Sequence, residues 1–80
     1  MDSTEFFKII GRNIKQLRIE RKIAQQDLAA ACNFEKSNLA RLEAGKTNPT
    51  VRTLFKISEE LKVPISRLFE LNDSDKYSLT

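Results

Sequence analysis

The stretch QQDLAAACNFEKSNLARLEAGKTN, residues 25–48, decides the fold. It predicts two short helices, over 25–32 and 36–44, because apolar residues recur in each at helical spacing. Asn33 separates them, and asparagine tolerates the left-handed backbone conformation of a sharp turn. Gly45 follows the second helix, where a helix end favours a residue free to adopt positive φ. The apolar positions are Leu28, Ala29, Cys32, Leu39 and Leu42.

Three more helices are predicted on either side of this pair, over 4–21, 51–61 and 65–71. Thr50 is a suitable N-cap for the second of them, and Pro64 suits the start of the third. Residues 72–80 read as a polar tail without periodicity, which we expect to fray. The fold class is therefore all-α, with five helices in a single domain over 1–80. The apolar positions are Phe6, Ile10, Ile14, Leu17, Leu54, Ile57 and Leu61.

Composition narrows the function. The 80 residues include no histidine and one cysteine, which removes Ser-His and Cys-His catalysis and any disulfide within the chain. Cys32 is expected to be a small core residue. No enzyme activity, metal or cofactor is expected. The start MDSTEFFK has neither a basic segment nor a long apolar run, so we expect a cytoplasmic protein without a membrane partner.

The charge is unevenly distributed. Net charge is +3, but residues 8–70 hold 13 Lys/Arg against 7 Asp/Glu. A basic body between weakly acidic ends is consistent with a polyanionic partner, although many solvent-exposed faces are also rich in lysine.

Residues 25–44 form a helix-turn-helix pattern, in which the second helix can enter the DNA major groove. Lys36, Ser37 and Arg41 project from the outer face of that helix and are candidates for reading bases, and Ala40 can contact a thymine methyl. The alternative is that Lys36 and Arg41 only solubilise the helix.

A second set of residues is predicted to contact the DNA backbone without reading sequence. Gln25 and Thr50 lie at helix starts, where free N–H groups and the helix dipole favour an anion. For 46–48 the alternative is ordinary loop polarity. Lys15 is expected to be a solvated charge. The full set is Gln25, Asn38, Lys46, Thr47, Asn48, Thr50 and Arg52.

The chain resembles the Xre/Cro-like helix-turn-helix family of phage repressors and restriction–modification controller proteins. The resemblance spans 10–69, and the entry to the second motif helix, 34–37, looks most like a controller protein. It implies a compact lambda-repressor-like fold and a regulator of transcription. The residues that carry it are Gln25, Leu28, Ala29, Leu39, Leu42, Glu43, Gly45, Pro49, Leu54, Ile57, Leu61 and Val63.

The resemblance also implies an ion pair between Arg18 and Glu43. This pair would stabilise the orientation of the second motif helix, 36–44, which is the recognition helix. Gly11 stands where the family commonly has glycine, and a close helix contact is the expected reason. The sequence departs from the family where Lys22 and Lys62 replace a usual glycine. It departs again at two helix starts, where Ala24 and Glu35 are poor capping residues.

The expected partners are double-stranded DNA and a second copy of the chain, with no small-molecule ligand. A homodimer on a near-palindromic operator would place two recognition helices on one face of the duplex. Its interface is predicted at apolar residues that exceed what a five-helix core can cover: Phe55, Ile65, Phe69 and Leu71.

Two alternatives stay open. In the first, the chain is an antitoxin that binds a toxin protein and autoregulates its operon. In the second, it is a piece of a larger regulator. The operator sequence and the choice between activation and repression cannot be deduced from these residues.

Overall fold

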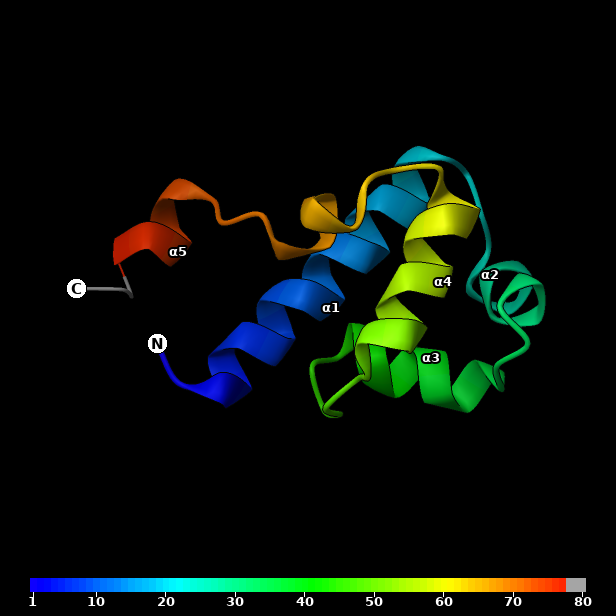
Figure 1. The fold of residues 1–80 in the computed structure, drawn as a ribbon, viewed down its shortest axis with the longest axis horizontal. Helices are drawn as coiled ribbons and strands as arrows, with labels where there is room; N and C mark the ends of the chain where they lie inside the picture. The colour runs from blue at the N-terminus through cyan, green and yellow to red at the C-terminus, as the bar shows by residue number, and fades with distance from the viewer. Residues whose placement is uncertain (78–80) are drawn as a thin grey trace.

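The computed structural model describes residues 1–77, and every regular element in that part of the chain is helical (Figure 1). The elements are α1 (Ser3–Glu20), α2 (Gln25–Ala31), α3 (Lys36–Glu43), α4 (Val51–Leu61), the 3₁₀-helix η1 (Ile65–Phe69) and α5 (Asp73–Tyr77). The all-α class is confirmed, and α1 to α4 begin and end within one residue of the predicted bounds.

The segment predicted as a helix over 65–71 is helical, but the helix is shorter than predicted. It is a 3₁₀-helix that ends at Phe69, and the backbone is extended at Glu70. The buried side chain of Asn13 accounts for this, because its Nδ2 donates to the carbonyls of Leu68 and Glu70, both at 2.9 Å. These hydrogen bonds attach the end of η1 to α1, and they occupy carbonyls that would otherwise accept from backbone N–H groups of a longer helix.

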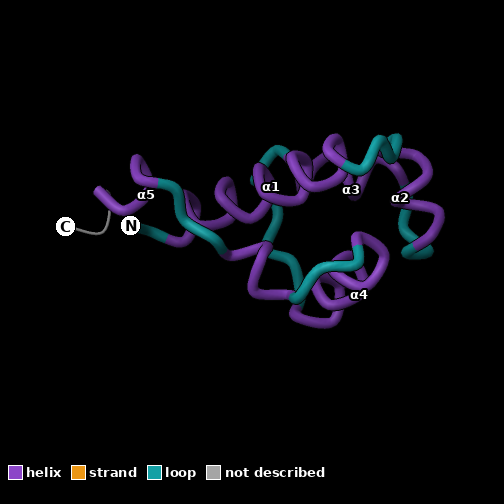
Figure 2. The backbone as a smooth tube through the Cα atoms, turned by 90° about the horizontal axis from the view of Figure 1, so that it is seen from above, coloured by secondary structure: helices purple, strands orange, loops and turns teal. Residues whose placement is uncertain are grey.

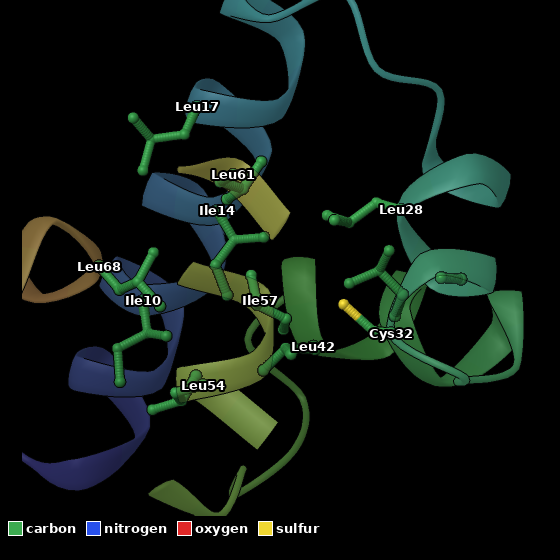
Figure 3. Packing of buried hydrophobic residues seen from close by; sticks show 12 residues of the cluster. Ile10, Ile14, Leu17, Leu28, Cys32, Leu42, Leu54, Ile57, Leu61 and Leu68 are labelled. Carbon is green, nitrogen blue, oxygen red and sulfur yellow. The ribbon is translucent and has the colours of Figure 1, made fainter. Parts of the chain in front are cut away.

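The core lies where α1, α2, α3, α4 and η1 meet (Figure 3). Ile14, Ile57 and Leu61 are fully buried, and Leu68 of η1 joins them. Cys32 is buried as expected, and its burial raises the pKa of the thiol. Viewed from above, α1, α2 and α3 lie on one side of the molecule and α4 on the other (Figure 2). The recognition helix α3 therefore rests mainly on α1 and α2.

Each of the first four helices ends in the same way. A residue with positive φ follows the last turn, and the next backbone N–H donates to the carbonyl five residues earlier. This is the geometry of a Schellman motif, which satisfies the carbonyls left free at a helix end. Lys22 and Lys62, which replace the usual glycines, adopt φ of 56° and 57° and keep the same turn. The four N–H donors are those of Ile23, Phe34, Lys46 and Val63.

The expectation that the tail frays was wrong for residues 73–77, which form α5. Asn72 and Asp75 cap its start reciprocally. The Asn72 Oδ1 accepts from the Asp75 N–H at 2.8 Å, and the Asp75 Oδ2 accepts from the Asn72 N–H at 2.9 Å. This pattern is a capping box, and the Asn-x-x-Asp spacing is the signal in the sequence that indicates it. The remainder of the predicted tail, 78–80, lies outside the described residues.

An ion pair between distant parts of the chain attaches α5 to α1. Arg12 Nη1 and Nη2 donate to Asp75 Oδ1 and Oδ2 at 3.0 and 2.7 Å. This two-point contact raises the pKa of Arg12 and lowers that of Asp75. It places α5 at the end of the molecule where α1 begins (Figure 1).

Acid is expected to release α5 from α1. The hydrogen bond from Arg12, followed by that from the Asn72 N–H, lowers the pKa of Asp75. A carboxylate with a lowered pKa contributes its full stabilisation above its unfolded pKa, near about 4, and loses it as the pH falls through the folded pKa. The amide chemical shifts of Asn72 and Asp75 should therefore be constant at neutral pH and move below about pH 4.

Two variants test this assignment. In Asp75→Asn the amide chemical shift of Asn72 at neutral pH should already equal the value that the wild type reaches in acid. Asp73→Asn changes a fully exposed neighbour, so it should keep the wild-type transition. A wild-type transition above about pH 5 would contradict the assignment.

Candidate nucleic-acid interface

The helix α3 presents one face to the core and the opposite face to solvent. Leu39 and Leu42 are 1% and 4% exposed and fix its underside against the core. Lys36, Ser37 and Arg41 are exposed on the outer side, as the periodicity predicts. No ion pair engages Lys36 or Arg41 within residues 1–77. Three predicted base-reading side chains are therefore accessible to a partner.

Ala40, the fourth predicted base-reading residue, lies differently. Its side chain is half-buried and lines a hollow with Lys15, Arg18 and Gln25. It is consequently less accessible than its three neighbours on α3. A role for Ala40 in contacting a thymine methyl stays a prediction.

Several predicted backbone-contact residues gather around one shallow hollow. Asn38 of α3 lies there with Thr47, Asn48 and Thr50, and the volume is about 270 Å³. Thr50 is the N-cap of α4, as predicted, since its Oγ1 accepts from the Thr53 N–H at 3.1 Å. Three segments thus bring polar groups together beside the recognition helix. Lys46 and Arg52 are exposed.

The ion pair between Arg18 and Glu43 is present and connects α1 to the end of α3. Arg18 Nε and Nη2 donate to Glu43 Oε2 and Oε1 at 2.7 and 3.0 Å, and Nη1 donates to the Ile23 carbonyl at 2.9 Å. Their side chains are 11% and 4% exposed. The hydrogen bond to Glu43 raises the pKa of Arg18. The pair therefore holds the recognition helix, as the resemblance implies.

Gln25 belongs to the same network, which the sequence did not reveal. Its Nε2 donates to Glu43 Oε1 at 3.0 Å. One amide hydrogen is thus committed to Glu43, and no second side-chain hydrogen bond of Gln25 is present within residues 1–77. At the starts of α2 and α3, Ala24 and Glu35 make no side-chain capping bond, so backbone N–H groups there lack such a partner.

Both glycines of the chain lie where α1 contacts the end of α3. A Cβ on Gly11 would come within 2.4 Å of the Leu42 carbonyl oxygen and 2.6 Å of that of Glu43. Gly45 has a φ of +73°, and a Cβ there would lie 2.6 Å from the Lys8 Cα. The close helix contact expected at Gly11 is confirmed. It sets the depth at which α3 rests on α1.

The four residues predicted for a dimer interface do not share one environment. Phe55 is 52% exposed on α4. Ile65 and Phe69 pack partly against the chain's own core, and the Phe69 ring stacks on Phe6 with centroids 6.0 Å apart. Leu71 is half-buried. The fifth-helix region therefore has less free apolar surface than predicted.

Val51 was missed as a candidate. It is 73% exposed and lies four residues before Phe55, so both side chains share one face of α4. Apolar spacing of i and i+4 was the available signal.

Within residues 1–77, no helix combines the length and apolar character that a membrane span requires.

The comparisons with known proteins agree with this geometry. The helix-turn-helix family profile HTH_3 matches residues 14–68. An uncharacterised HTH-type transcriptional regulator of Sinorhizobium fredii, y4dJ, is 38% identical over 56 residues, which cover 70% of this chain and 73% of that protein. The immunity repressor of Bacillus phage phi105 is 36% identical over 59 residues, or 74% of this chain, and the chain spans only 41% of that repressor.

A solved structure also matches most of the chain. The wild-type restriction–modification controller protein C.Esp1396I has a TM-score of 0.76 and 25% identity, and the match covers 91% of this chain and 95% of that one. The chain belongs to the Xre/Cro-like helix-turn-helix family of transcriptional regulators.

Proposed function

We propose that the protein is a cytoplasmic, sequence-specific DNA-binding regulator of transcription that acts as a homodimer on a near-palindromic operator. The observation that carries this proposal is the free outer face of α3. Lys36, Ser37 and Arg41 are exposed there, while Leu39 and Leu42 hold the helix from beneath. Lysine and arginine can donate to guanine O6 and N7, and the start of a recognition helix approaches base edges most closely.

The surrounding polar groups support the same function. Asn38, Thr47, Asn48 and Thr50 border one side of α3, and Gln25 begins α2 on another. Contacts of this kind fix the register of a protein on DNA without reading its sequence. Lys46 and Arg52 add exposed positive charge that can neutralise phosphates.

A dimer is proposed because one recognition helix reads only a few base pairs. Two copies related by a twofold axis would place their α3 helices about 34 Å apart, one turn of the duplex. Phe55 and Val51 supply an exposed apolar face for that contact. Ile65, Phe69 and Leu71 are partly exposed and would flank it.

The more specific proposal is a restriction–modification controller protein. Its support is the match to C.Esp1396I, which covers nearly the whole of both chains. No structural observation favours the antitoxin alternative.

Selection of bound duplexes from a random library tests the function. We expect an inverted repeat whose half-sites are centred about 10 base pairs apart. Lys36→Ala and Arg41→Ala should each reduce discrimination between the selected and scrambled sequences by about 1–3 kcal/mol. Lys46→Ala should instead weaken binding to all duplexes alike.

The outcomes separate the parts of the proposal. Failure of the wild-type protein to enrich any sequence would reject sequence-specific binding. Enrichment with unchanged discrimination in both the Lys36 and the Arg41 variants would reject the base-reading assignment alone. A selected single site without a repeat would reject the symmetric dimer.

A further inference from the structure

Two hollows lie between α1 and α3. One, of about 260 Å³, is lined by Lys15 and Arg18 of α1 together with Gln25, Ala40 and Glu43. The second, of about 480 Å³, is lined by Thr4, Phe7 and Lys8 of α1 and by residues 44–48. Ala44 lines both, so they adjoin. We call these two adjoining hollows the α1–α3 furrow.

The furrow connects two separate parts of the proposed DNA surface. Gln25 lies at one end, and Lys46, Thr47 and Asn48 lie at the other. These residues come from the start of α2 and from the loop after α3. A single DNA strand that contacts both groups of residues would therefore run along the furrow.

The charge of the furrow suits a polyanion. Four cationic side chains line it, and the one carboxylate, Glu43, has both oxygens occupied by Arg18 and Gln25. Three of the cations are exposed lysines, and none of them forms an ion pair with a described residue. The lysines are Lys8, Lys15 and Lys46.

The two glycines explain why lysines of α1 reach this position. Gly11 lets α1 approach the end of α3, and Lys8 and Lys15 lie on the same side of α1, about one turn before and after it. Gly45 leaves room for the Lys8 side chain, since a Cβ there would lie 2.6 Å from Lys8 Cγ. Lys15 is exposed, as the sequence predicts, and it lines the hollow that also holds Gln25.

We propose that the α1–α3 furrow carries the sugar-phosphate backbone of one DNA strand, with Lys8 and Lys15 as phosphate contacts in addition to Gln25 and Lys46. Seven helical residues span about 10 Å, which is the axial length of about three nucleotides of one strand. The two lysines would therefore reach different phosphates. This inference rests on the proposed DNA-binding function and extends its surface to α1.

The test measures the salt dependence of binding for Lys8→Gln, Lys15→Gln and the double variant. Dissociation constants for the selected operator and for a scrambled duplex are determined by fluorescence anisotropy between 50 and 200 mM salt. The association constant falls as salt rises, and each phosphate contact adds about 0.9 to the magnitude of the slope of its logarithm against the logarithm of the salt concentration. The magnitude of this slope should be smaller by about 0.9 in each single variant and by about 1.8 in the double variant.

Affinity for the two duplexes should fall by the same factor, since phosphate contacts carry no sequence information. Lys62→Gln is the matched control, because Lys62 is an exposed lysine at the end of α4 that lines neither hollow. Its slope should equal that of the wild type. Thermal unfolding of each variant shows that the fold is retained.

The outcomes distinguish this inference from the function on which it rests. Salt-dependent binding by the wild type with an unchanged slope in the double variant overturns the furrow and leaves the function standing. A change in slope for only one of the two lysine variants overturns the proposal that one strand follows the whole furrow. A larger loss on the operator than on the scrambled duplex overturns the assignment to the backbone. Absence of any DNA binding by the wild type overturns both proposals.

Discussion

Glu43→Gln is expected to lower the free energy of unfolding by about 3–5 kcal/mol, because it leaves the positive charge of Arg18 in a largely buried site without its counter-charge. The Glu43 side chain is only 4% exposed and accepts from both Arg18 and Gln25. An amide in its place keeps the shape but loses the charge. Denaturant unfolding monitored by circular dichroism measures the change.

A second substitution separates the value of the pair from the penalty of breaking it. Replacing both partners, as in Arg18→Met with Glu43→Leu, should recover most of the lost stability, since an apolar pair of similar volume is often as stable as a buried ion pair. Glu59→Gln alters an exposed carboxylate of α4 and should change stability by less than about 0.5 kcal/mol. A similarly small effect of Glu43→Gln would show that water reaches Arg18 and compensates its charge.

Gly11→Ala is the second substitution with a large expected effect. In an open helix, alanine in place of glycine stabilises by about 1 kcal/mol. Here the added Cβ would meet the carbonyl oxygens of Leu42 and Glu43 at 2.4 and 2.6 Å, and these are backbone atoms that cannot rotate away. We expect a net loss of about 2–3 kcal/mol, since overpacking commonly costs that much.

Thermal unfolding measures the effect of Gly11→Ala. The sign of the change in melting temperature is informative as well as its size, because alanine would raise it in an open helix. The melting temperature should fall by about 10–20 °C for a domain of this length. Gln16→Ala, an exposed position on the same helix, controls for helix propensity and should shift it little. A rise in melting temperature for Gly11→Ala would mean that α1 and α3 separate easily and do not define each other's position.

The same contact links stability to the proposed function. The lysines of the furrow face α3 only because the two helices meet at Gly11 and Gly45. A variant that pushes α3 away from α1 should therefore also weaken DNA binding in proportion to the misplacement. The close packing of α1 on the end of α3 explains why a glycine inside α1 is tolerated despite its low helix propensity.

Local interactions explain what the sequence predicted about the fold. Helix bounds follow from apolar spacing over three or four residues and from end signals such as Thr50 and Asn33, so α1 to α4 were placed within one residue. The inward faces were predicted for the same reason. The exposure of Lys36 and Arg41 followed directly, because a helix with a buried underside must present its other side to solvent.

The residues whose environment was mispredicted depend on contacts between distant parts of the chain. Asp75 lies 63 residues from Arg12, and no local pattern indicates that these two meet. Phe69 looked like surplus apolar surface until the fold placed it against Phe6. Lys15 is a solvated charge as predicted, but its position beside Gln25 depends on how closely two helices approach, which no local pattern indicates.

The sequence by itself determined the helices and their apolar faces, since both follow from interactions between residues near one another in the chain. The family was indicated by the resemblance of the motif residues and is shown by the match of its family model. Only the tertiary structure decided which charges share a surface. Gly11 allows α1 to approach α3 closely, and this approach brings Lys8 and Lys15 beside the recognition helix. The physical reason is that a charge acts on whatever lies within a few ångströms, and packing sets those distances between residues that the chain order keeps apart.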